Sequence, residues 1–146
     1  MKLSGIILCI IFLQACTIKY SFTGTSISPE IKTVSIEYFD NVAELIQPTL
    51  SDYFTETLRE KFITETNLRL INGEADMNFS GKIIGYNQRH AAVQADETAA
   101  KNRLTITVNV VFVNNKEPSK NFEQNFSRFG DFDSNKSLDE VEQSLI

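Results

Sequence analysis

The feature that most constrains the fold of this 146-residue chain is the stretch 104–113, in which apolar and polar side chains alternate. Leu104, Ile106 and Val108 occupy every second position, and Thr105 and Thr107 lie between them. A period of two is typical of a β-strand with one buried face. The sheet that contains this strand therefore needs a second layer over its apolar side.

Two segments have the pattern of helices that can form this layer. The first begins near Pro48, which suits the first turn of a helix, and extends for about 18 residues. Its apolar positions follow steps of three and four: Leu50, Tyr53, Phe54, Thr57, Leu58 and Phe62, with Ser51 on the polar face. The second helix covers 138–146, where Ser137 and Glu140 form a capping box. It ends on apolar residues, and we expect the chain to be truncated there.

Further strands are predicted at 32–39, 68–71 and 75–86, with a connection at 40–47 and a loop at 90–100. Gly81 and Gly85 mark a bulge or a close backbone approach. The segment after the turn at 114–120 has Phe122, Phe126 and Phe129 at helical spacing. We predict a strand antiparallel to 104–113, with a bulge that resets its alternation.

These elements predict an α+β fold. We expect a mostly antiparallel or mixed sheet of about four strands with two helices packed on one face, a two-layer sandwich.

The N-terminus has the pattern of a lipoprotein signal. Lys2 precedes an apolar run at 6–12, and Cys16 directly follows Ala15. We expect residues 1–15 to be the signal peptide, Cys16 to carry lipid, 16–31 to form a leader and 32–146 to form one domain. The alternative is an ordinary signal peptide that contains cysteines. The apolar run is shorter than the about 20 residues of a membrane-spanning helix.

The composition excludes several classes of function. The net charge of −5 argues against a nucleic-acid binder, which needs a basic patch. Cys9 would leave with the signal and Cys16 would be acylated, so neither a disulfide nor a cysteine zinc site is expected in the domain.

The sequence offers few catalytic groups. His90 is the single histidine, which excludes a catalytic triad or a two-histidine metal site within one chain. Asp131, Asp133 and Glu97 are candidates for an acid–base pair, but acids are also common beside turns. The six glycines form no phosphate-binding loop. We therefore expect no catalytic residue, no metal and no cofactor.

Three cations are candidates for a binding site. Lys101 and Arg103 begin the clearest strand, and Arg89 ends the strand before the loop. If these strands pair, the cations gather at one end of the sheet, where they suit phosphorylated sugar head groups. The alternative is that they are solvated charges that protect sheet edges from aggregation.

Several segments together resemble the LptE family of lipopolysaccharide-assembly lipoproteins: Cys16, YSFTGTSI at 20–27, KTVSI at 32–36, NLRL at 67–70, NRLTITV at 102–108 and NFEQNFSR at 121–128. The resemblance implies a small sheet with two helices on one side, the second helix being longer in the family. It also implies an outer-membrane lipoprotein that plugs the LptD β-barrel and binds lipopolysaccharide through basic residues. Because Thr17, Ile18 and Lys19 after the cysteine include no acidic residue, we expect the periplasmic side of that membrane. The resemblance does not assign the family's basic residues to particular positions of this chain, so Lys101, Arg103 and Arg89 are candidates from the sequence pattern alone. The alternative is another envelope lipoprotein module that binds peptidoglycan or an envelope protein.

Overall fold

The computed structural model describes residues 27–45, 47–90 and 101–146. The expected signal peptide, the lipidation site Cys16, most of the leader and Glu97 lie outside these residues. The elements in chain order are β1 (Thr33–Ile36), β2 (Asp40–Asn41), α2 (Leu50–Glu65), β3 (Arg69–Leu70), β4 (Met77–His90), β5 (Lys101–Asn114), the 3-10 helix η2 (Pro118–Lys120), β6 (Phe122–Asp133) and α3 (Leu138–Leu145).

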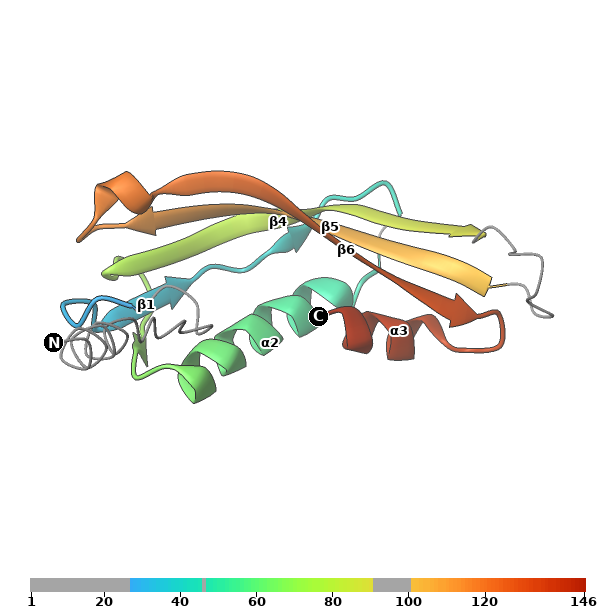
Figure 1. Ribbon diagram of the computed structural model, residues 1–146, viewed down its shortest axis with the longest axis horizontal. Coiled ribbons are helices and arrows are strands. Elements are labelled where there is room, and N and C mark those ends of the chain that lie inside the picture. Colours follow the sequence, from blue (N-terminus) through green and yellow to red (C-terminus); the bar gives the residue numbers. More distant parts are fainter. Residues whose placement is uncertain (1–26, 46, 91–100) are drawn as a thin grey trace, which may run out of the picture.

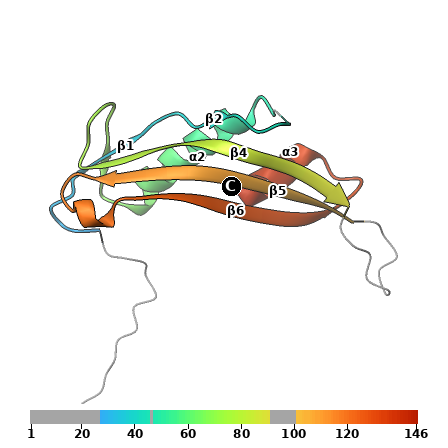
Figure 2. The ribbon, with the colours of Figure 1, turned by 90° about the horizontal axis from the view of Figure 1, so that it is seen from above.

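The strands form one mixed sheet in the order β3-β1-β4-β5-β6, with β2 also paired to β4. β1 is parallel to β3 and β4, whereas β4, β5 and β6 are antiparallel. Figures 1 and 2 show α2 and α3 on the same face of the sheet, which we call the inner face. The predicted α+β class with two helices and a mixed sheet is confirmed. The predicted number of about four strands is wrong, because the sheet has six.

The missed strand is β2, in the segment predicted to be a connection. Asp40 and Asn41 pair with Lys82 and Ile83 of β4. Two residues are too few to show a periodic pattern, and the pairing is made by backbone groups. Residues 40–41 are therefore part of the sheet although their sequence has no strand signal.

β5 confirms the alternation found in the sequence. Leu104, Ile106 and Val108 are buried on the inner face. The threonines between them occupy the opposite face, on which no α-helix of the described residues lies and which we call the outer face (Figure 1). Because β5 lies between β4 and β6, it is an interior strand.

β6 is a strand antiparallel to β5, as predicted, but the predicted bulge in it is wrong. Pairing continues without a shift from Phe122 opposite Phe112 to Asp133 opposite Lys101. Alternation then places Phe122 and Phe126 on the inner face and Phe129 on the outer face. Because this segment is a strand, the helical spacing of the three phenylalanines does not place them on one face.

The irregularity lies in β4, at the glycines that the sequence singled out. The β4–β5 register shifts between Ile83 and Gly85. At Gly81 an added Cβ would run into the backbone carbonyl of Asn109 and the ring of Phe39. The expectation of a bulge or a close approach is confirmed at both positions.

Leu50, Phe54, Leu58 and Phe62 of α2 pack against the core as predicted, but two other positions of the helix differ from the prediction. Ser51, placed on the polar face, is buried, and so is Thr55, whereas Tyr53 is exposed. The Thr55 hydroxyl accepts a hydrogen bond from the backbone N–H of Phe39 at 3.1 Å. This contact satisfies a backbone donor just beyond β1, where the chain leaves the sheet, and explains why a polar side chain faces the core.

α3 begins as predicted, with the Ser137 hydroxyl accepting a hydrogen bond from the N–H of Glu140 at 3.4 Å. A second contact joins the helix to the sheet: the Tyr86 hydroxyl of β4 donates to Oε1 of Glu142 at 2.6 Å. Both side chains are buried. Burial and the neighbouring carboxylate raise the pKa of Tyr86. This hydrogen bond fixes α3 under the sheet through two groups that water cannot reach.

Candidate functional site

The three predicted cations lie at one end of the outer face. Arg89 of β4 is directly opposite Arg103 of β5. Lys101 precedes Arg103 by two residues on the same strand, so both side chains point to the same face. The structure therefore brings the three residues together, as the sequence predicted for paired strands.

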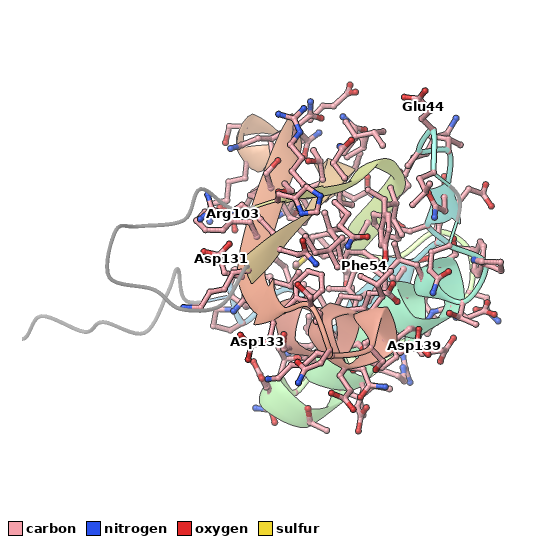
Figure 3. All side chains as sticks on the ribbon, turned by 90° about the vertical axis from the view of Figure 1, so that its right-hand side faces the viewer. Glu44, Phe54, Arg103, Asp131, Asp133 and Asp139 are labelled. Carbon is pink, nitrogen blue, oxygen red and sulfur yellow. The ribbon has the colours of Figure 1, made fainter. Side chains whose placement is uncertain are left out.

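Two carboxylates share this end with the cations. Asp131 is opposite Arg103, and Asp133 is opposite Lys101, both across the β5–β6 pair. Figure 3 shows Arg103 and Asp131 side by side, with Asp133 further along the same strand. Arg103 thus lies between Arg89 on one side and Asp131 on the other. We call the cluster of these five residues the charged end.

Arg103 and Asp131 form a forked ion pair. Nε of Arg103 donates to Oδ1 of Asp131 at 2.6 Å, and its terminal nitrogen donates to Oδ2 at 2.8 Å. The pair raises the pKa of Arg103 and holds the pKa of Asp131 below its ordinary value. The guanidinium also lies 4.2 Å from the ring centre of Phe129, a cation–π contact. Arg103 is therefore a preorganised group whose donors are already partly used.

The alternative of edge protection is wrong for Lys101 and Arg103. Both residues lie on β5, an interior strand, and an interior position offers no edge to protect. Binding of phosphorylated sugars by Arg89, Lys101 and Arg103 remains a prediction. An anion that approached Arg103 would compete with Asp131 for the guanidinium donors of Arg103. Arg89 provides a second guanidinium group on the neighbouring strand β4.

The other catalytic candidates have structural contacts. Asp131 is held by Arg103, which leaves it poorly suited to exchange protons. Nδ1 of His90 lies 2.9 Å from Oδ1 of Asn102, its partner across the β4–β5 pair. Within the described residues, no group of three or more His, Cys, Asp or Glu side chains is arranged to hold a metal ion.

The middle of the outer face carries a row of hydrogen-bonded polar side chains, which we call the polar ladder. The hydroxyls of Thr107 and Ser127 lie 2.7 Å apart. Nδ2 of Asn109 donates to Oδ1 of Asn125 at 2.9 Å and to Oε1 of Glu123 at 3.3 Å. The alternation of β5 predicts its polar positions. Their partners on β6 were missed, because the phenylalanine spacing of that segment conceals its register.

The described helices include none that is long and apolar enough to cross a membrane. Among curated proteins, no significant sequence match was found.

Several solved structures are similar to this chain at low sequence identity. The PelC dodecamer from Paraburkholderia phytofirmans is 14% identical, with a TM-score of 0.50 and coverage of 84% of this chain and 88% of PelC. A lipoprotein from Neisseria meningitidis is 8% identical, with a TM-score of 0.48 and coverage of 77% and 91%. A hypothetical protein from Chlamydia trachomatis is 12% identical, with a TM-score of 0.47 and coverage of 67% and 71%.

The family assignment comes from the sequence. A family model described as LptE, lipopolysaccharide-assembly, matches residues 31–146, which include every strand and helix described above. The resemblance found in scattered segments therefore extends through every described strand and helix. This chain belongs to the LptE family of lipopolysaccharide-assembly proteins.

Proposed function

We propose that this chain is an outer-membrane lipoprotein, anchored through Cys16 on the periplasmic side, that plugs an LptD-like β-barrel. In this role it assists the transport and insertion of lipopolysaccharide and catalyses no reaction. The observation that carries the proposal is the family match over residues 31–146.

The outer face supports a role inside a polar lumen. Barrel interiors are lined by polar side chains, so a plug needs a rigid polar surface. The polar ladder provides one, because Thr107, Ser127, Asn109 and Asn125 hold one another in fixed positions. A preformed polar surface loses less side-chain entropy on docking than a flexible one.

The N-terminal cysteine supports the location. A single acyl chain gives only marginal membrane binding, so a lipoprotein needs further chains or protein contacts for a stable anchor. Contacts with a barrel would supply this second attachment. The charged end is the candidate for lipopolysaccharide phosphates, with Arg89 and Lys101 next to the forked pair of Arg103.

The test is recovery of the partner from native outer membranes with a tagged, full-length chain. A photo-crosslinking residue at Asn125, in the polar ladder, reports contact of the outer face, and one at Glu60, exposed on α2, is the matched control. We expect a large barrel protein in about equal amount, crosslinked from Asn125. If no barrel protein is recovered while Cys16 is acylated, the proposal is wrong and binding to peptidoglycan is the next assay.

Lipopolysaccharide binding is tested separately. Arg89→Gln and Lys101→Gln should weaken binding of the purified protein to lipopolysaccharide. Lys82→Gln, which removes an outer-face cation away from the charged end, is the control. Equal effects of all three changes would show that net charge, and not this cluster, governs binding.

A further inference from the structure

β6 gives the sheet a long open edge. It pairs with β5 along one side for twelve residues, and no described element pairs with its other side. Figure 2 shows it as the outermost strand along the length of the molecule. On the opposite side of the sheet, β3 and β2 have two residues each, and the end of β4 beyond Ile83 has no described strand beside it. Among the described strands, β6 therefore offers the longest open edge to which another strand can be added.

The edge lacks several of the devices that usually prevent strand addition, although it carries charged side chains, of which Arg128 points to the inner face. Residues 122–133 contain neither proline nor lysine, and the register with β5 shows no bulge. Phe122, Phe126 and Phe129 are 40%, 47% and 58% exposed. Backbone donors and acceptors along such a strand remain available to a partner strand.

We propose that the open edge of β6 pairs antiparallel with β6 of a second copy, about a two-fold axis at Phe126. Residues 122–130 of the two copies would then form the centre of one continuous sheet. Such an axis is perpendicular to the sheet and keeps inner residues opposite inner residues. The proposal concerns the chain before it meets another partner, and it does not depend on the plug function.

The inner face favours this register. Phe126 lies opposite Phe126 of the second copy, and aromatic pairs across strands are stabilising. Phe122 lies opposite Gly130 of the second copy, where no side chain opposes the ring. Leu145 of α3 lies directly under Gly130, at 3.1 Å from the position of an added Cβ. The ring of Phe122 thus meets an apolar surface in place of water.

The outer face favours the same register because the polar ladder continues across the axis. Ser127 lies opposite Asn125 of the second copy. Within each copy Thr107 already contacts Ser127, and Asn109 already contacts Asn125. The dimer would therefore carry two unbroken rows of hydrogen-bonding side chains over four strands.

Neighbouring registers place poor pairs opposite one another. An axis at Ser127 brings Asp131 against Glu123, and an axis at Arg128 brings two arginines together. An axis at Gln124 sets Arg128 against Lys120. Like charges directly opposite are destabilising. An axis at Asn125 avoids like charges and keeps polar residues opposite one another on the outer face, but it separates the two Phe126 rings.

The test uses single cysteines in the full-length chain, produced in excess of any barrel and oxidised in membranes. Cross-strand partners are close enough for a disulfide only where they are directly opposite. Phe126→Cys should give a disulfide-linked homodimer. Glu123→Cys and Phe129→Cys alone should not, but the double variant should, since these two positions face each other. The wild-type chain, with Cys9 and Cys16 alone, gives the background.

The result expected is about tenfold more homodimer from Phe126→Cys and from the double variant than from either single control, because register is fixed by which face is buried. Equal yields from all positions would indicate random collision and overturn the proposal. A crosslink to another protein, or none from Phe126→Cys in a chain with unchanged circular dichroism, would overturn it as well. Since barrel recovery is scored in a separate assay, failure here leaves the plug function standing.

Discussion

Replacement of Tyr86 by phenylalanine should measure what holds α3 to the sheet. The change removes one hydroxyl and leaves Oε1 of Glu142 without its donor at 2.6 Å. Glu142 is 4% exposed, so water replaces the donor poorly. A buried polar group left without a partner costs about 1–3 kcal/mol. With about 4 °C of Tm per kcal/mol for a chain of this size, we expect Tm to fall by about 4–12 °C.

The double variant Tyr86→Phe, Glu142→Met tests whether the loss of stability comes from the unpaired carboxylate of Glu142. Removal of both polar partners at similar volume is close to neutral, so the double variant should recover to within about 1 kcal/mol of wild type. Thermal unfolding followed by circular dichroism measures both variants. The reasoning is refuted if Tyr86→Phe alone leaves Tm unchanged, or if the double variant is less stable than the single one.

Three further changes test the fold. Leu104→Ala removes a side chain that is 0% exposed and should lower the free energy of unfolding, measured with urea, by about 2–5 kcal/mol. Ile84→Ala, at a 40% exposed position, is the control and should lower it by less than about 0.5 kcal/mol. Gly81→Ala should cost about 1–3 kcal/mol, since its Cβ meets the carbonyl of Asn109; full stability would show that β4 and β5 can move apart. The pKa of Asp76 is lowered from 3.8 to about 2, chiefly by the backbone N–H of residue 32, so its stabilisation is complete above pH 4 and is lost as pH falls to about 2. The Tm difference between wild type and Asp76→Asn should therefore be constant above pH 4 and vanish near pH 2.

Strands with a clear period could be predicted from the sequence, and contacts made by backbone could not. The alternation from Leu104 onward gives β5 its faces correctly, because one side is buried along the whole strand. β2 was missed because two residues carry no period. The burial of Thr55 was missed because its cause is a backbone N–H that is 16 residues away in the chain, at Phe39.

The cations of the charged end could be predicted from the sequence, but their acidic neighbours could not. Arg89, Arg103 and Lys101 were expected at one end of the sheet, since strands that follow each other commonly pair. Asp131 was considered only as a possible acid, because its place opposite Arg103 depends on the β5–β6 register. A bulge expected in β6 would have moved that register by one residue. The ion pair between Asp131 and Arg103 could therefore be identified only from the structure.

The position of β1 has a consequence for the order in which the protein folds. β4, β5 and β6 are consecutive in sequence and pair as neighbours, whereas β1 lies between β3 and β4 and is parallel to both. Contacts between distant segments form slowly, because the intervening chain must first lose its entropy. We expect pulse-labelled hydrogen exchange to protect β4 and β5 before β1. If Cys16 carries lipid as proposed, the described strand nearest to that residue would then join the sheet only after the β4–β5 hairpin has formed.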